Sequence, residues 1–407
     1  MNWDLYKDIL SIDSTSGKER ELAEWLLANL EAPHKEAMEV GDGTLNLLLC
    51  WGTPQVVFCT HMDTVPPYIA PVFHNFAGDT PSGGTPLASL APAPPTVSCV
   101  PCGDLYPAGP SPCPCPGVDM SAEGSIPAKK ETITGRGTCD AKGQILAMYT
   151  ACKELEAEGK TGFGLLLLSG EETGSWGAKA FSKTAFRAPF LIVGEPTENK
   201  LVSAAKGTLS YDLKFAGQAF HSGYPQYGTS AIDRFNEFYN KLKAIDFGED
   251  PELGATTWNV GLLRSNNPQN ILSPELTCRL YFRTTFVSHE AVQRWMSEQV
   301  LFPEASLRDP VRANASGNSI CPAVSGSFRG GDVPARYVTL PGFAQAPVAF
   351  GSDAPHLSGF GHKLIIGPGS IRFAHRDDEH IGAEELAEAV RLYKNIFARL
   401  QETTNQL

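Results

Sequence analysis

Short apolar runs, each followed by glycine or by polar side chains, recur through the first half of the chain. They occupy residues 46–49, 56–59, 165–168 and 190–193. Continuous apolar runs of this length are typical of strands buried on both faces of a parallel sheet. Apolar residues at helical spacing predict helices after Ser16, which we expect to be the cap, over 144–158 and over 383–400. The alternation predicts an α/β fold with a mostly parallel central sheet.

The pattern changes between residue 200 and about residue 325. Alternating or apolar strands are predicted at 209–215, 256–263 and 277–286, and helices at 231–245 and 290–300. This order is typical of a small α+β unit. Two further apolar runs, at 347–350 and 363–366, read as the last core strands. We therefore expect a first domain built from 1–198 and 331–407, with 199–330 inserted as a second domain.

Residues 72–130 have a different composition from the rest of the chain. Twelve of the 31 prolines fall between Pro81 and Pro127. Proline interrupts both helices and sheet ladders, so this segment reads as a low-complexity insertion. An alternative interpretation is a structural zinc knuckle, whose ligands would be the four cysteines of the segment, Cys99, Cys102, Cys113 and Cys115. The short spacing from Cys113 to Cys115 argues against that alternative.

Composition and charge narrow the function classes. The chain has 407 residues, enough for two domains, and a formal net charge of −12 without a long basic run. This balance argues against nucleic acid or an anionic membrane surface as a partner. No apolar run is long enough to span a membrane, and the first ten residues lack a signal-peptide pattern. Six scattered cysteines then read as reduced thiols, and we predict a cytoplasmic enzyme.

The run 165–168 ends at Gly170, and two adjacent glutamates, Glu171 and Glu172, follow. Open α/β sheets bind their ligands at the carboxyl ends of such strands. Two neighbouring carboxylates rarely both stay ionised unless a cation holds them. One glutamate would be a metal ligand and the other would be free for acid–base chemistry. The alternative is a solvated Glu-Glu turn.

Other metal-ligating side chains occur at comparable positions. His61 directly follows a predicted strand, and Asp63 can accept the second N–H of its imidazole. Asp140 precedes a predicted helix, where an ordinary helix cap is the alternative. Two histidines and three carboxylates, His61, Asp140, Glu172, Glu195 and His375, make a ligand set for two zinc-type ions that share one bridging carboxylate.

Six motifs, in this order along the chain, resemble the dinuclear zinc aminoacylase family. That family includes acetylornithine deacetylase, succinyl-diaminopimelate desuccinylase and carboxypeptidases that remove glutamate from folates. The motifs are THMDTVPP, GRGTCDAKG, SGEETGSWGAKAF, VGEPT, FHSGYP and AHRDDEHI. The resemblance implies a zinc-peptidase-like catalytic domain with an inserted dimerisation, or lid, domain. The insertion at 72–130 lengthens the separation between His61 and Asp140 to 79 residues, and it falls near the expected active-site mouth.

The resemblance also implies a role for each matched residue. Asp140 would bridge two divalent ions, zinc or alternatively cobalt, with His61 and Glu195 completing one site and Glu172 and His375 the other. Glu171 would be the general base and Asp63 would orient His61. His221 would stabilise the oxyanion from the partner subunit of a homodimer. The residues implied to contact the substrate are Asn270, Arg283, Gly369 and Ser370.

These features predict a metal-dependent amidohydrolase that removes an N-acyl group from an amino acid with a free carboxylate. N-acetylornithine deacetylation in arginine biosynthesis is the favoured reaction. N-acetylcitrulline, N-succinyl amino acids and dipeptides are alternative substrates. A catalytically silent metal-binding protein, or an interaction protein that docks through the Cys/Pro-rich insertion, is the alternative of another class. The presence of Glu171 argues against silence.

Overall fold

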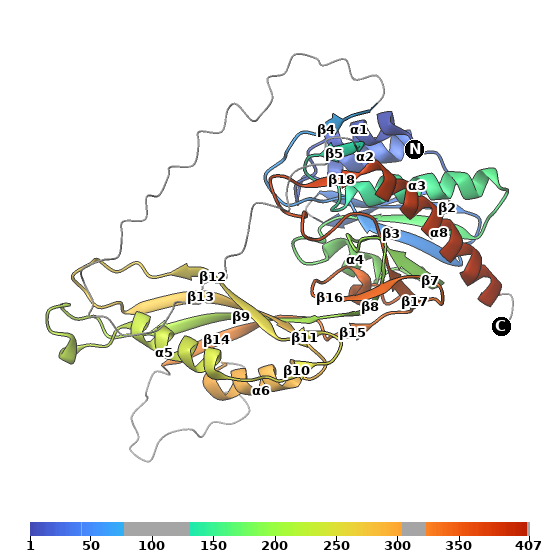
Figure 1. Ribbon diagram of the computed structural model, residues 1–407. Helices are drawn as coiled ribbons and strands as arrows, with labels where there is room; N and C mark the ends of the chain where they lie inside the picture. Colours follow the sequence, from blue (N-terminus) through green and yellow to red (C-terminus); the bar gives the residue numbers. More distant parts are fainter. Residues whose placement is uncertain (42, 77–129, 303–322, 405–407) are drawn as a thin grey trace, which may run out of the picture.

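The computed structural model describes residues 1–41, 43–76, 130–302 and 323–404, which form two lobes (Figure 1). The first lobe is built on a six-stranded sheet, in which the four consecutive strands β6, β3, β7 and β17 are parallel. In spatial order the strands are β1 (His34–Gly41), β2 (Thr44–Trp51), β6 (Phe163–Leu168), β3 (Val56–His61), β7 (Ala188–Val193) and β17 (Phe360–Ile365). The predicted α/β fold with a mostly parallel sheet is confirmed.

Helices cover both faces of this sheet, which explains why its strands are continuous apolar runs. Alternate residues of the same strand enter different cores: Leu165 and Leu167 one, Leu166 and Leu168 the other. The first core lies under α1 (Trp3–Ser11), α2 (Arg20–Asn29), α3 (Lys142–Ala157) and α8 (Ala383–Thr404). The second lies under the short helix α4 (Trp176–Phe181) and the 3-10 turn η3 (Ala354–His356).

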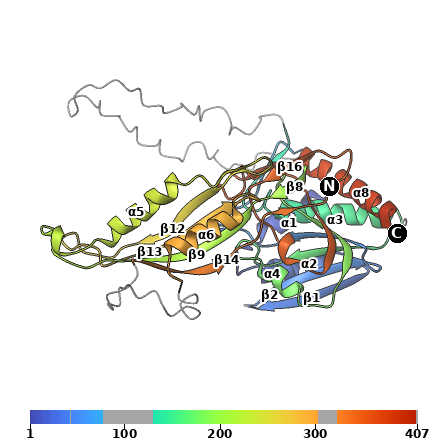
Figure 2. The same cartoon turned by 90° about the horizontal axis from the view of Figure 1, so that it is seen from below.

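The second lobe is an antiparallel four-stranded sheet with two helices, α5 and α6, on one face (Figure 2). Inward side chains of β13, such as Leu276, Leu280 and Phe282, alternate with more exposed ones and pack against these helices. The elements are β12 (Thr257–Arg264), β13 (Glu275–Thr284), β9 (Gly207–Ala216), β14 (Val324–Gly330), α5 (Ala231–Ala244) and α6 (His289–Gln299). A short hairpin joins β10 (Glu249–Asp250) to β11 (Gly254–Ala255).

Two three-stranded sheets complete the described chain. One contains β15 (Ala335–Arg336), β8 (Leu201–Ala205) and β16 (Gln345–Val348), and the other contains β18 (His380–Gly382), β5 (Thr132–Thr134) and β4 (Val72–His74). The prediction that 347–350 is a central-sheet strand is wrong, because β16 pairs with β8. Strand β4 lies inside the segment predicted as low-complexity, and the four cysteines of that segment lie outside the described residues.

Three smaller predictions can be compared with the structure. Ser16 does not cap α2; the helix begins at Arg20, and the Ser16 hydroxyl donates to Asp63 instead. Five of the six scattered cysteines are buried free thiols, as predicted, and Cys321 lies outside the described residues. Among the described residues, no helix combines the length and the apolar character needed to cross a membrane.

Candidate metal centre at the strand ends

The predicted metal-ligating residues come from five separate segments that meet at one edge of the central sheet. His61 ends β3, Glu172 follows β6 and Glu195 follows β7. These three strands are parallel neighbours, so their carboxyl ends lie side by side. Asp140 lies two residues before α3, and His375 lies in the loop between β17 and β18.

The carboxylate of Asp140 lies between the two histidines. His61 Nε2 is 3.1 Å from one of its oxygens, Oδ1, and His375 Nε2 is 3.3 Å from the other, Oδ2. His375 Nε2 is also 2.8 Å from Glu172 Oε1. Ligand atoms of His61, Asp140 and Glu172 all lie within 4.8 Å of one another. A carboxylate that turns each oxygen toward a different histidine has the arrangement of a bridging ligand.

Buried negative charge is concentrated at this edge. Burial raises the pKa of Glu195 well above its ordinary value, and the nearby Glu171 and Asp140 raise it further. Burial likewise raises the pKa of Glu171, helped by Asp353, Glu172 and Asp140. Hydrogen bonds to Asp140 and Glu172 raise the pKa of His375 to about 10. Carboxylates that outnumber their cationic partners in a buried cluster fit a divalent metal ion.

Asp63 connects three of the segments. Its side chain accepts hydrogen bonds from the backbone N–H of Glu171 (3.0 Å) and of Glu172 (3.1 Å). The Ser16 hydroxyl donates to it at 2.9 Å, and Asp63 Oδ1 lies 3.3 Å from His61 Nδ1. Asp63 is fully buried. It therefore holds the Glu-Glu turn as well as facing the histidine.

Residues 120–399 match the model of the peptidase family M20/M25/M40, which covers more than half of the chain. The chain belongs to this family. A protein from Aspergillus fumigatus named probable carboxypeptidase is 28% identical, and the match covers 96% of this chain and 84% of that protein. The protein is therefore a metal-dependent hydrolase of the metallopeptidase type, and the predicted family resemblance is confirmed.

Solved structures with a similar fold include two peptidases. A tripeptidase from Staphylococcus aureus superposes with a TM-score of 0.65 at 16% identity, covering 98% of this chain and 97% of that one. A metallo-carboxypeptidase of family M20 from Sulfolobus solfataricus superposes with a TM-score of 0.57 at 14% identity, covering 96% and 97%. At these identities the likeness concerns the fold alone.

The residues predicted to contact substrate do not meet within one chain. Asn270 and His221 are neighbours, because the backbone N–H of Ser222 donates to the Asn270 carbonyl at 2.9 Å. They lie beyond the far end of the second-lobe sheet. Arg283 lies near the other end of β13, beside the first lobe, and a Cβ added at Gly351 would come within 3.8 Å of its Nη1. A ten-residue strand is about 30 Å long, so His221 cannot reach the metal centre of its own chain.

The predicted glycine-rich contact, Gly369 with Ser370, packs on the loop that carries Asp140. Gly369 has φ +82°, and a Cβ there would come within 2.5 Å of the Cys139 Cβ, so this position requires glycine. The Ser370 hydroxyl donates to Glu198 at 2.9 Å. The structure thus gives both residues a packing role beside the centre.

Three buried residues at the centre were not predicted from the sequence. Asp353 is 2% exposed, and burial raises its pKa to about 6. It follows the predicted strand 347–350 by three residues. A search for acidic residues just after predicted strands would therefore have found it. Arg136 and Glu379 form a buried ion pair beside Asp140. Both lie inside quoted motifs, but their contact spans 243 residues and has no sequence signal.

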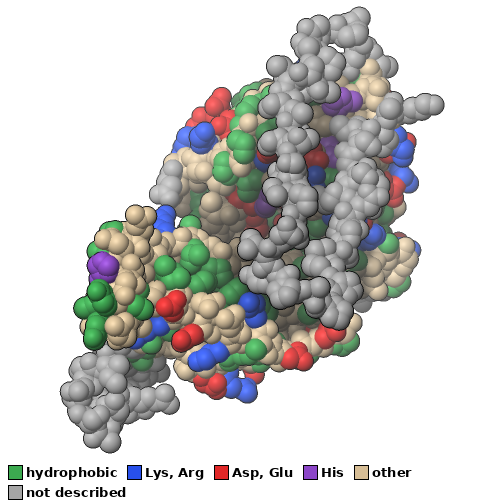
Figure 3. Space-filling model, turned by 60° about the vertical axis from the view of Figure 1, so that its left-hand side comes forward, with side chains coloured by type: hydrophobic (Ala, Val, Ile, Leu, Met, Phe, Trp, Pro, Cys, Tyr) green, Lys and Arg blue, Asp and Glu red, His purple; other side chains and the backbone are tan. Residues whose placement is uncertain are grey.

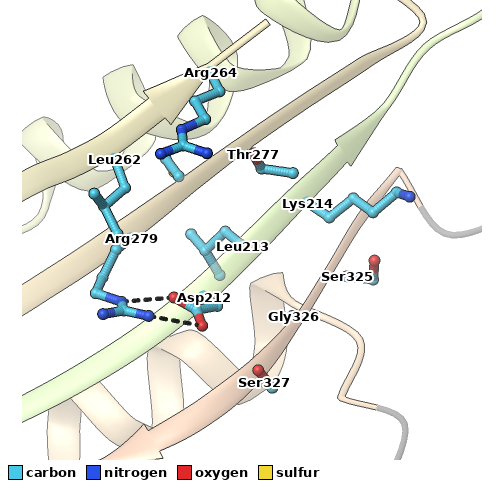
Figure 4. Close-up of a pocket in the computed structure, with 11 residues that line it drawn as sticks. Asp212, Leu213, Lys214, Leu262, Arg264, Thr277, Arg279, Ser325, Gly326 and Ser327 are labelled. Atoms are coloured by element: carbon cyan, nitrogen blue, oxygen red, sulfur yellow. Dashed lines mark hydrogen bonds and ion pairs between the residues drawn. The ribbon is translucent and has the colours of Figure 1, made fainter.

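An open groove lies on the second-lobe sheet, away from the candidate metal centre. It is lined by residues of β9, β12, β13 and β14, and Arg279 is held there by both oxygens of Asp212 (Figure 4). Among the described residues that line it, no group of metal ligands comes together and no carboxylate is buried. Its charged lining residues are of both signs, namely Asp212, Lys214, Arg264 and Arg279, and basic and acidic side chains are also interspersed on the face of the molecule in Figure 3. The groove therefore reads as a solvated sheet face.

The hydrogen bonds of Asp63 make it the first test of the centre. In Asp63→Asn, the amide NH₂ must face one of the two N–H groups of Glu171 and Glu172. We expect zinc affinity to fall about 10- to 100-fold, the usual effect of losing a group that orients metal ligands. Competition with a chelator on the metal-free protein measures it. Asp212→Asn, which removes a carboxylate charge in the second lobe, should bind zinc normally; equal affinities in both variants would contradict the role of Asp63.

Proposed function

We propose that the protein is a dinuclear zinc hydrolase that cleaves an amide bond next to a free carboxylate of its substrate. The observation that carries this proposal is Asp140, whose two oxygens face two different histidines. Asp140 would bridge two ions. The remaining ligands would be His61 and Glu195 at one ion, and Glu172 and His375 at the other. Cobalt is the alternative metal.

The chain's own residues supply the proton transfers. Bound zinc ions would lower the pKa of the attacking water and polarise the scissile carbonyl. Glu171 accepts the water proton at its carboxylate and passes it to the leaving nitrogen. Its burial favours the protonated form between these two steps, because burial raises its pKa. Asp63 holds the backbone of Glu171 in place through the N–H hydrogen bond at 3.0 Å.

Substrate binding requires a second copy of the chain. Arg283 lies beside the first lobe, where its guanidinium would bind the substrate carboxylate through two hydrogen bonds. His221 and Asn270 lie at the far end of the second lobe, with His221 exposed. A homodimer that brings this end over the partner's metal centre would place His221 where negative charge develops on the carbonyl oxygen. Gly369 and Ser370, which lie beside the metal centre, would line the substrate-binding site.

Two arguments indicate the substrate class: the proposed binding of a substrate carboxylate by Arg283, and the names of related proteins. The Aspergillus relatives are named probable carboxypeptidases, which favours short peptides with a free C-terminal carboxylate. N-acyl amino acids, including N-acetylornithine, N-acetylcitrulline and N-succinyl amino acids, present the same amide and carboxylate. The names of these Aspergillus relatives do not mention N-acetylornithine or arginine biosynthesis, so peptides become the first candidate and N-acetylornithine one of several others.

A substrate panel tests this proposal. Amine release is measured with dipeptides, N-acetyl and N-succinyl amino acids and the C-terminally amidated form of each, with added zinc or cobalt. We expect cleavage of free-carboxylate substrates and a loss of at least roughly 100-fold on amidation, since a site built for a charged partner rejects the neutral analogue. Equal cleavage of the amidated forms would contradict the carboxylate site. No release from any compound would favour a catalytically silent homologue.

A further inference from the structure

Glu379 and Arg136 form an ion pair that is almost completely removed from solvent. Glu379 is 0% exposed and Arg136 is 2% exposed, and Arg136 Nη1 lies 2.8 Å from Glu379 Oε2. A buried ion pair is costly to desolvate, and well-packed apolar residues often stabilise a protein as much or more. General stability is therefore a weak reason for this pair, and its neighbours point to a more local effect.

The second oxygen of Glu379 faces the backbone of the bridging ligand. Glu379 Oε1 accepts hydrogen bonds from the N–H of Cys139 at 3.1 Å and from the N–H of Asp140 at 3.2 Å. The peptide of Asp140 lies just before α3 and has no helical partner for this N–H. The carboxylate of Glu379 thus fixes the main chain from which the Asp140 side chain projects.

Arg136 holds the segment that carries the second histidine. Its Nη1 also donates to the carbonyl of Arg376 at 3.0 Å, the residue after His375. His375 has φ +65°, a left-handed conformation that is uncommon for non-glycine residues and needs support from its surroundings. Strands β5 and β18 run side by side between these contacts, with Thr134 opposite His380. The ion pair therefore joins the Asp140 loop directly to the His375 loop.

We propose that Glu379 and Arg136 are positioning residues that set the distance between Asp140 and His375, and thereby the affinity of the centre for its metal ions. The inference rests on the proposed dinuclear centre. Asp140 Oδ2 lies 3.3 Å from His375 Nε2, so the same ion must be reached from both loops. Ligands have to be held to within about 0.5 Å for a metal site to work. Neither loop has a regular element at the ligand itself, and the ion pair supplies the missing constraint.

Glu379→Asp tests the proposal with the smallest change. The charge and the pair with Arg136 can remain, but the shorter side chain cannot reach both N–H groups. Zinc affinity of the metal-free protein, measured by chelator competition, should fall about 10- to 100-fold. Thermal unfolding of the metal-free protein is measured in parallel. Glu39→Asp makes the same change in the exposed pair with Arg20 in the same lobe and should leave zinc affinity unchanged.

A double variant separates positioning from a merely structural role. In Arg136→Gln with Glu379→Gln, one amide oxygen can still accept from the N–H groups of Cys139 and Asp140, while its NH₂ faces the second amide. The shorter glutamine side chain at position 136 cannot keep the contact with the Arg376 carbonyl, so only the constraint on the Asp140 loop remains. We expect the zinc affinity of the double variant to fall less than that of Glu379→Asp, even where its unfolding temperature falls more. Affinity that follows unfolding temperature across all variants would overturn the proposal, as would normal affinity in Glu379→Asp.

A replacement variant and the zinc content of the wild-type protein complete the test. Should Glu379→Asp not fold, Arg136→Lys replaces it, because lysine keeps the charge but cannot contact both Glu379 and the Arg376 carbonyl; normal zinc affinity there overturns the proposal. Wild-type protein that binds fewer than two zinc ions would instead refute the proposed dinuclear centre. The zinc affinities of the variants therefore test the inference, whereas the zinc content of the wild-type protein tests the proposed function.

Discussion

Glu171→Gln should lower kcat by roughly 1,000-fold, the middle of the range for losing a general acid–base group, while the protein keeps its metal ions. The amide has nearly the same shape but cannot take the proton of the attacking water. None of the described hydrogen bonds to metal-ligating side chains involves the Glu171 side chain; its backbone N–H is what Asp63 holds. Turnover and zinc content, measured on the same preparation, separate chemistry from binding.

The neighbouring residue provides the matched control. Glu172 contacts His375 at 2.8 Å and belongs to the cluster of metal-ligating atoms. Glu172→Gln should therefore lose zinc affinity, and its activity should partly return at high zinc concentration. Added zinc should not rescue Glu171→Gln. Normal turnover in Glu171→Gln, or rescue by zinc, would show that the two glutamates have been assigned the wrong way round.

The central fold was predictable because burial on both faces leaves a strong pattern. The runs 56–59, 165–168 and 190–193 all lie within strands of the sheet. Elements at the periphery carry weaker patterns. Strand β1, HKEAMEVG, is largely exposed at the edge of the sheet, and α1 was not recognised as a helix. Apolar character showed that 347–350 is a strand region but not that its partner would be β8.

The proximity of the predicted metal ligands was predictable for a different reason. A parallel sheet collects its strand ends at one edge, so polar residues after separate strands have to meet there. This rule applies to His61 and Glu172, which end or follow neighbouring strands. Asp140 and His375 come from loops and meet them within hydrogen-bonding distances. No comparable rule predicts the contacts that support these residues from behind. The hydrogen bonds that Glu379 accepts from the Asp140 loop depend on the conformations of two loops about 240 residues apart, which no local pattern encodes.

His221→Ala should lower kcat by about 100- to 1,000-fold, the usual effect of removing an oxyanion donor. Zinc affinity should stay normal, because His221 is not one of the proposed metal ligands and lies beyond the end of the second-lobe sheet that is far from the metal centre of its own chain. The same distance makes a stronger test possible. Glu171→Gln lacks the base and His221→Ala lacks the oxyanion donor, so in a mixed dimer one of the two sites contains both residues.

Mixing equal amounts of the two inactive variants under conditions that exchange subunits should restore about a quarter of wild-type activity. Half of the dimers would be mixed, and each would hold one intact site out of two in a symmetric pair. Pairing Glu171→Gln with Glu172→Gln is the control: both changes affect residues of the same chain's centre, so no mixed site is complete. Absence of recovery, when subunit exchange is shown by differently tagged chains, would mean that His221 does not act across the dimer.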